Sequence, residues 1–158
     1  IPAFKNTKVI NLDFQDYVVK PKREITIRVY VDMTADLFHY GHANFLKNAS
    51  LVGDFLIVGI HSDKVVQEYK RSPIMTMEER IAVVSAIKYV DEVIPDAPLL
   101  IDEKWIKKHD IDMIVHGDDW EISKLQNIYK IPIEMGIFKT IPHTPSISTT
   151  DIIKRLNK

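Results

Sequence analysis

The sequence predicts one α/β domain that is built on a parallel sheet. Short β-branched runs alternate along the chain with segments of helical periodicity, which is the pattern of βαβ units with right-handed crossovers. The length of 158 residues suits one domain with a sizeable core. No internal repeat or low-complexity tract divides the chain.

The strands of this sheet are predicted from short apolar runs. These runs are residues 25–32, 54–63, 91–95 and 113–117. The first two are apolar enough to be buried on both faces, as strands of a parallel sheet are. Residues 1–24 mix charges with scattered apolar positions, so we interpret them as an N-terminal arm or linker before a domain of residues 25–158.

Helices are predicted between these strands. The first begins after Gly41 and stops at Gly53. The second opens with Thr76 and Glu79, at the spacing of a capping box, and continues to residue 90. The remaining helices are predicted over residues 102–110 and 148–156.

Composition excludes several classes of function. The 21 basic and 22 acidic residues give a formal net charge of −1, so no overall positive field favours a nucleic-acid partner. The lack of cysteine excludes disulfides and thiolate metal sites. No apolar run approaches the roughly 20 residues of a membrane span, and no signal peptide is visible. We therefore expect a cytoplasmic protein; because it opens on Ile1 rather than Met, we also expect a fragment or a processed end.

Ligand residues are expected where the strands lead into helices. In parallel sheets, ligands bind beyond the carboxyl ends of the strands. This rule selects residues 32–42, 61–73, 116–120 and 143–150, and the polar residues of interest lie in these stretches.

In the first of these loops His39 and His42 flank Gly41 at a predicted helix start. Free backbone N–H groups and the positive end of the helix dipole make such a turn an anion site. The imidazoles can donate N–H groups to phosphate oxygens. The spacing alone is common, and two half-buried histidines that only cap the helix are the alternative interpretation. A metal site is disfavoured, because no carboxylate or thiolate cluster lies beside the pair.

Each of the remaining loops also has a ligand-binding interpretation and a purely structural one. Lys70 and Arg71, with Arg80 in the next helix, would spread positive charge around a phosphate, or would simply be solvated. The carboxylates after Gly117 could bind a ribose or base and Trp120 could pack on a ring, or the stretch is a plain turn. Hydroxyls at 148–150 form a second anion site at a helix start, or only a cap. Together, these features at one rim favour a polyphosphate ligand.

Four motifs resemble a known family. "DLFHYGH", "YVDEVIP", "HGDDW" and "ISTTDII" stand in the order and approximate spacing of the cytidylyltransferases that make CDP-ethanolamine, CDP-choline and CDP-glycerol. The resemblance covers residues 27–156 and implies a Rossmann-like three-layer α/β/α fold. It also implies that CTP binds with Mg²⁺, which is held through the nucleotide phosphates and not by a protein metal site. A phosphoalcohol would then attack the α-phosphate and release pyrophosphate.

The resemblance assigns roles residue by residue. The catalytic residues it implies are His39, His42 and Lys70. The nucleotide-binding residues it implies are Met33, Thr34, Asp36, Gly41, Arg80, Gly117, Asp118, His143, Ser148, Thr149 and Thr150. The acceptor-binding residues it implies are Asp32, Tyr69, Lys70 and Arg71. Asp36 is expected to orient its loop.

The chain departs from the family pattern at four positions. The family usually has Gly, Phe, Arg and Gly where this chain has Met33, Ala35, His143 and Ser146. The stretch before the first histidine also resembles phosphonate cytidylyltransferases, so the acceptor is open between a phosphoalcohol and a phosphonate such as 2-hydroxyethyl- or 2-aminoethylphosphonate. An ATP-using adenylyltransferase of the same fold and a degenerate nucleotide-binding domain are two further hypotheses. "RVYVD" resembles the first-strand motif of dimeric relatives, so we expect a homodimer; otherwise it is a core strand.

Overall fold

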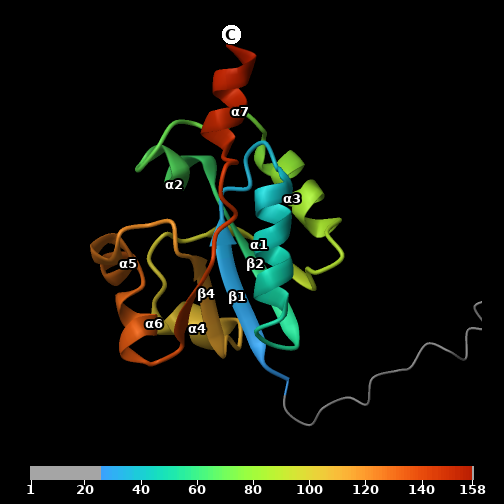
Figure 1. The fold of residues 1–158 in the computed structure, drawn as a ribbon. Coiled ribbons are helices and arrows are strands. Elements are labelled where there is room, and N and C mark those ends of the chain that lie inside the picture. The colour runs from blue at the N-terminus through green and yellow to red at the C-terminus, as the bar shows by residue number, and fades with distance from the viewer. Residues whose placement is uncertain (1–25, 158) are drawn as a thin grey trace, which may run out of the picture.

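A five-stranded parallel sheet forms the centre of the structure (Figure 1). The structure is a computed structural model that describes residues 26–157, so the predicted arm at 1–24 lies outside the described residues. The strand order is β3-β2-β1-β4-β5. The strands are β1 (Arg28–Met33), β2 (Phe55–His61), β3 (Glu92–Ala97), β4 (Met113–Gly117) and β5 (Phe138–Ile141).

The strand order places β1 in the middle and creates a switch point beside it. The chain builds β2 and β3 outward on one side of β1, and then returns to add β4 and β5 on the other side. The carboxyl ends of β1 and β4 are therefore where the loops diverge, which is the usual place for a ligand crevice in open α/β sheets.

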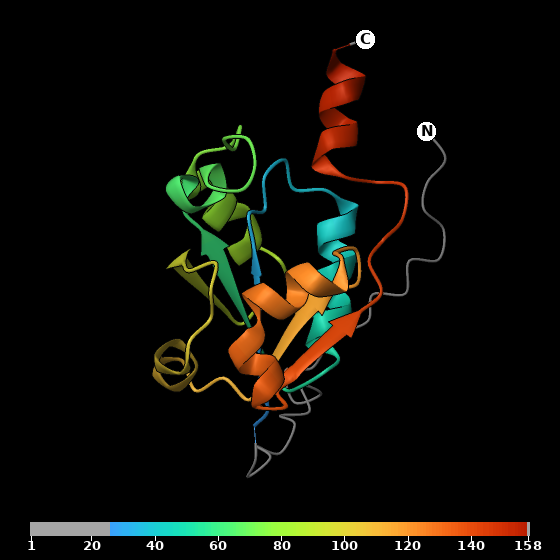
Figure 2. The same cartoon turned by 90° about the vertical axis from the view of Figure 1, so that its left-hand side faces the viewer.

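Helices cover both faces of the sheet, as Figures 1 and 2 show. Side chains alternate along β1, so Val29 and Val31 pack on one face and Tyr30 on the other. The first face is covered by α1 (Tyr40–Ser50) and α3 (Met77–Ser85), and the second by α4 (Glu103–Lys108) and α5 (Ile122–Ile128). The remaining helices are α2 (Asp63–Gln67), α6 (Lys130–Glu134) and α7 (Thr149–Leu156). The predicted Rossmann-like three-layer α/β/α fold is confirmed.

Several boundaries and elements differ from the prediction. The helix predicted to reach residue 90 keeps its capping box, in which Glu79 N donates to Thr76 Oγ1 at 3.3 Å, but it ends at Ser85. Strand β5 and helices α2, α5 and α6 were not predicted. β5 has only four residues and two of them are exposed, so it lacks the apolar run that marks a buried strand.

Helix α7 is the element least attached to the body. It has no buried residue, and it projects away from the sheet in both views (Figures 1 and 2). Across residues 26–157, no helix has the length and apolar character that a membrane crossing requires.

We expect Gly59→Ala to destabilise the protein. A Cβ at this position of β2 would overlap the Tyr30 hydroxyl and would lie 2.8 Å from Ala97 Cβ. Overpacking of this kind typically lowers the free energy of unfolding by about 1–3 kcal/mol. Urea denaturation should reveal the loss, with the exposed helix variant Asn48→Ala as a near-neutral control. An unchanged unfolding midpoint would contradict this packing.

Candidate active site

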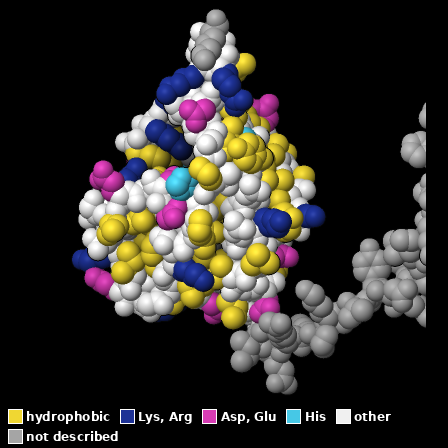
Figure 3. Space-filling model, in the orientation of Figure 1, with side chains coloured by type: hydrophobic (Ala, Val, Ile, Leu, Met, Phe, Trp, Pro, Cys, Tyr) yellow, Lys and Arg dark blue, Asp and Glu magenta, His cyan; other side chains and the backbone are white. Residues whose placement is uncertain are grey.

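A cavity of about 420 Å³ opens at the carboxyl ends of β1, β2 and β4. Its walls come from all four stretches in which ligand residues were predicted. Among the predicted site residues, those that line it are Asp32, Met33, Thr34, Asp36, His39, Gly41, His42, Tyr69, Lys70, Arg71, Gly117, His143, Ser148, Thr149 and Thr150. Figure 3 shows Lys and Arg side chains gathered on the upper part of this face, around the base of α7.

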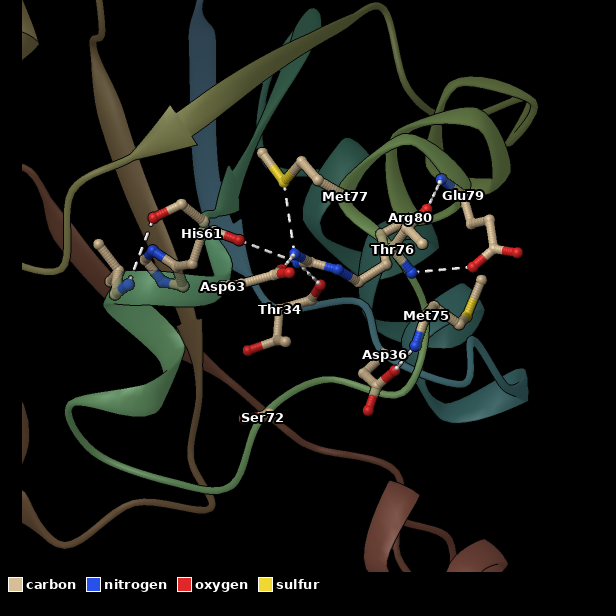
Figure 4. Close-up of polar contacts among 12 residues, drawn as sticks. Thr34, Asp36, His61, Asp63, Ser72, Met75, Thr76, Met77, Glu79 and Arg80 are labelled. Atoms are coloured by element: carbon tan, nitrogen blue, oxygen red, sulfur yellow. Dashed lines mark hydrogen bonds and ion pairs between the residues drawn. The ribbon is translucent and has the colours of Figure 1, made fainter.

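Two of the predicted nucleotide-binding residues, Arg80 and Asp118, do not line the cavity. Arg80 is fully buried, and its guanidinium donates to the carbonyl oxygens of Thr34 and His61 at 2.7 and 2.9 Å and pairs with Asp63 (Figure 4). It therefore supports the loops from beneath and does not face a phosphate. Asp118 accepts hydrogen bonds from the ring and backbone of His143, at 2.7 and 2.9 Å. This pair joins the loops after β4 and β5.

The two histidines both cap helix α1 and face the cavity. His39 Nδ1 accepts the N–H of Gly41 at 3.1 Å, and His42 Nδ1 accepts the N–H of His39 at 3.3 Å. The rings stack with their centroids 4.0 Å apart. Because each Nδ1 is an acceptor, the proton of each neutral ring must lie on Nε2. The capping and ligand-binding interpretations are therefore compatible, since each uses a different nitrogen.

Both imidazoles are held in the neutral form. Burial lowers the pKa of His42 to about 3, and the nearby charges of His39 and Lys70 act in the same direction. Burial also lowers the pKa of His39. Near neutral pH the pair thus offers Nε2–H donors without a positive charge. Positive charge must come from lysine, arginine and the helix N-termini.

The loop between β1 and α1 is fixed by Asp36. Its buried carboxylate accepts the N–H of Met75 at 2.9 Å (Figure 4). It also accepts the N–H of Ile74 at 3.0 Å and an Arg71 N–H at 2.9 Å. Burial alone would raise the pKa of Asp36, but these donors lower it overall. Its backbone carbonyl also accepts the hydroxyl of Thr149 at 2.9 Å. The expected loop-orienting role of Asp36 agrees with this geometry.

Lys70 and Tyr69 form another wall of the cavity. Burial lowers the pKa of Lys70, and the Arg71 guanidinium lowers it further. Its ammonium lies 5.3 Å from the centre of the Tyr69 ring, and the Tyr69 hydroxyl is 3.2 Å from that of Thr34. A partly desolvated ammonium of this kind interacts strongly with a phosphate.

Helix α7 begins at the cavity and supplies a second helix N-terminus. Ser148 caps it by accepting the N–H of Asp151 at 3.1 Å. The hydroxyls of Ser148 and Thr149 are therefore occupied within the chain, and the backbone N–H groups of the first turn are the better candidates for an anion.

Two side chains in or beside the cavity were not singled out from the sequence. His61 lines the cavity beside Asp32, and Tyr129 donates a hydrogen bond to Asp32 at 2.6 Å. Asp119 and Trp120, in the predicted stretch after Gly117, also line the cavity. The only sequence signal for His61 is a histidine at the end of an otherwise apolar strand.

No group of three or more His, Cys, Asp or Glu residues that could hold a metal ion occurs within residues 26–157.

A cavity at the switch point of a parallel sheet, faced by two helix N-termini and paired imidazoles, belongs to the class of sites that bind phosphorylated ligands. The family model described as cytidylyltransferase-like matches residues 30–155, and the chain belongs to this family. The resemblance predicted from the four motifs is thereby confirmed.

Individual relatives agree with this membership. The chain is 42% identical over 142 residues to an ethanolamine-phosphate cytidylyltransferase of Dictyostelium discoideum, covering 87% of this chain and 39% of that protein. It is 38% identical to choline-phosphate cytidylyltransferase 2 of Arabidopsis thaliana, covering 84% of this chain and 45% of that one. The chain thus spans less than half the length of these relatives.

A solved structure supports the fold. The lipopolysaccharide core biosynthesis protein from Thermoplasma volcanium GSS1 superposes with a TM-score of 0.61 at 28% identity, covering 76% of this chain and 98% of that one.

We expect Arg80→Met to lower stability, since it leaves two buried carbonyls without donors. Each such group is worth about 1–3 kcal/mol, so the free energy of unfolding should fall by roughly 2–6 kcal/mol. The exposed Arg155→Met is the control and should change it by no more than about 0.5 kcal/mol. Equal urea midpoints for the two variants would refute the supporting role of Arg80.

Proposed function

We propose that the protein transfers CMP from CTP to the phosphate of a small phosphoalcohol and releases pyrophosphate. The observation that carries this proposal is the pair of neutral imidazoles whose Nε2–H groups face the cavity beside a partly buried lysine. The named activities of the ethanolamine-phosphate and choline-phosphate relatives support the same chemistry.

In this mechanism the α-phosphate lies against His39 and His42 at the start of α1. An acceptor phosphate oxygen, brought in by Lys70, attacks the α-phosphorus in line. A new P–O bond forms while the bond between the α-phosphorus and the bridging oxygen breaks, and pyrophosphate leaves with the electron pair. The Nε2–H donors stabilise the charge that develops on the α-phosphate, and no covalent enzyme intermediate is needed.

The rest of the nucleotide would occupy the remaining walls. The N–H groups at the start of α7 would bind the β- and γ-phosphates, and the loop from Gly117 to Trp120 would hold the cytidine. Mg²⁺, coordinated by the nucleotide phosphates, would neutralise part of their charge. Ser146 stands where the family usually has Gly. Its φ of 66° is the left-handed backbone conformation that glycine favours. This conformation favours a retained phosphate loop over a degenerate domain.

The oligomeric state and the cellular location of the protein are also proposals. A homodimer is supported by the resemblance of "RVYVD", although Val29, Tyr30 and Val31 are fully buried within one chain. The motif therefore serves first as a core strand, and light scattering at micromolar concentration would measure the oligomeric state. We infer a cytoplasmic location from composition alone.

We expect His42→Ala to lower turnover by about 10²-fold or more, which is the effect of removing one oxyanion-type donor. His42→Asn is the matched variant, because its amide oxygen can still accept the His39 N–H while it lacks the Nε2–H donor. Both variants should lose turnover, and thermal melting should show greater stability for the asparagine variant. Near-normal turnover in either would contradict the assigned role.

Substrate choice is tested by pyrophosphate release. CTP should support release with phosphoethanolamine, phosphocholine, glycerol 3-phosphate or 2-hydroxyethylphosphonate, and ATP should not. Release with ATP alone would favour an adenylyltransferase. Absence of release with every combination would favour the degenerate nucleotide-binding domain.

A further inference from the structure

The segment that joins α2 to α3 carries a serine that the cavity does not use. Residues 68–76 form neither helix nor strand, and Ser72 is exposed near their middle (Figure 4). Its neighbours Lys70, Arg71 and Pro73 line the cavity, whereas Ser72 does not. The Ser72 side chain therefore stands on the outer side of this wall, where another protein can reach it.

Pro73 gives Ser72 the backbone that a proline-directed protein kinase binds. The residue before a proline is restricted to extended conformations, and a kinase aligns its substrate as an extended segment. Proline also brings no N–H that the kinase would have to satisfy. Lys70 and Arg71 place two positive charges just before the serine. Within residues 26–157 the Ser72 hydroxyl has no hydrogen-bond partner, so it is available to react.

Arg71 connects Ser72 to the loop that carries the histidines. One guanidinium nitrogen donates to the carbonyl oxygen of Ser72 at 2.8 Å, and the other donates to the Asp36 carboxylate at 2.9 Å. Arg71 also lines the cavity, and its side chain is 43% exposed. The same guanidinium can thus reach an anion in the cavity or an anion attached to Ser72, and it cannot fully serve both.

We propose that Ser72 is a phosphorylation site for a proline-directed protein kinase, and that its phosphate draws Arg71 away from the cavity. The kinase would transfer the γ-phosphoryl group of ATP. A bond forms between the Ser72 oxygen and the γ-phosphorus while the bond from that phosphorus to the β–γ bridging oxygen breaks. ADP leaves with the electron pair, and a base of the kinase takes the hydroxyl proton.

Phosphate at Ser72 would oppose the proposed function, on which its effect on turnover rests. A phosphoserine carries a charge of about −1.5 to −2 near neutral pH and three acceptor oxygens, and arginine binds such a group with two parallel N–H donors. Arg71 would then leave Asp36, whose remaining donors are backbone N–H groups. The new charge would also lie close to Lys70 along the chain and would repel an incoming triphosphate.

The chain holds an internal comparison. A serine or threonine precedes proline at Ser72 and at Thr144 only. Thr144 lines the cavity, is partly buried, and follows His143 in place of a lysine or arginine. Accessibility and charge therefore both favour Ser72, and we expect phosphate there and not at Thr144.

The test treats the full chain with a purified cyclin-dependent kinase and MgATP, and then removes both. Tandem mass spectrometry should locate phosphate on Ser72, and none should appear in Ser72→Ala, which keeps its basal pyrophosphate release. Pro73→Ala keeps the hydroxyl but removes the recognised ring, so incorporation should be largely lost. The phosphorylated protein should have a kcat/KM for CTP lower by about 10-fold or more, the scale of one lost charge-assisted hydrogen bond. Ser72→Ala treated in the same way is the control and should not change.

Two substitutions separate charge from shape without a kinase. Ser72→Glu adds a carboxylate and Ser72→Gln adds an amide of nearly the same size, so kcat/KM for CTP should be lower in the glutamate variant. Repeating the pair in an Arg71→Met background removes the guanidinium that the charge would capture. The difference between the glutamate and glutamine variants should then largely disappear.

Three outcomes would overturn the inference and leave the proposed function intact. These are no phosphate on Ser72, an unchanged kcat/KM after phosphorylation, and an equal difference between the glutamate and glutamine variants in the Arg71→Met background. If the unmodified protein releases no pyrophosphate with any acceptor, the proposed function itself fails. Calorimetric titration with CTP then still measures the effect of phosphate at Ser72, and an unchanged dissociation constant would overturn the inference there.

Discussion

The buried guanidinium of Arg80 is the interaction on which the cavity depends. A planar fork bonds two carbonyls and a carboxylate from two separate nitrogens held in one plane, whereas a lysine has only one nitrogen. Arg80 uses it to join the carbonyl of Thr34, just after β1, to that of His61 at the end of β2 (Figure 4). The loop that carries His39 and the strand end that carries His61 therefore share one anchor. Asp63 supplies the counter-charge, so the positive charge of the guanidinium is neutralised within the chain.

Several residues around the cavity use some polar atoms for hydrogen bonds within the chain and leave other polar atoms free for a ligand. His39 and His42 give Nδ1 to the cap of α1 and keep Nε2–H for a ligand. Asp36 gives its carboxylate to the segment after α2 and its carbonyl to Thr149 at the start of α7. Two segments distant in sequence are thus tied to one short loop. Such a shell orients donors before a ligand binds, which is the condition for electrostatic catalysis.

The sequence predicted the loops that line the cavity better than it predicted the elements that support them. The rule that loops at the carboxyl ends of parallel strands carry ligands needs only strand positions, and four runs were apolar enough to provide them. It could not reveal that Arg80 points inward, because helical spacing does not say which polar residue finds buried carbonyls. It also could not reveal Tyr129, which lies far from Asp32 along the chain and meets it only in the fold. β5 was overlooked because its four residues carry too little apolar pattern.

In the proposed function, the replacement of the family's usual arginine by His143 would change which groups bind the triphosphate. Asp118 raises the pKa of His143, and His143 lowers the pKa of Asp118, so the two charges largely compensate each other. An arginine would keep donors free beyond such a contact, whereas the imidazole spends Nδ1 on the carboxylate and retains only Nε2. The positive end of α7 is adjacent and does not titrate. In the proposed function, the nucleotide's terminal phosphates would therefore depend mainly on backbone N–H groups, and the Asp118–His143 pair would hold the β4 and β5 loops together around them.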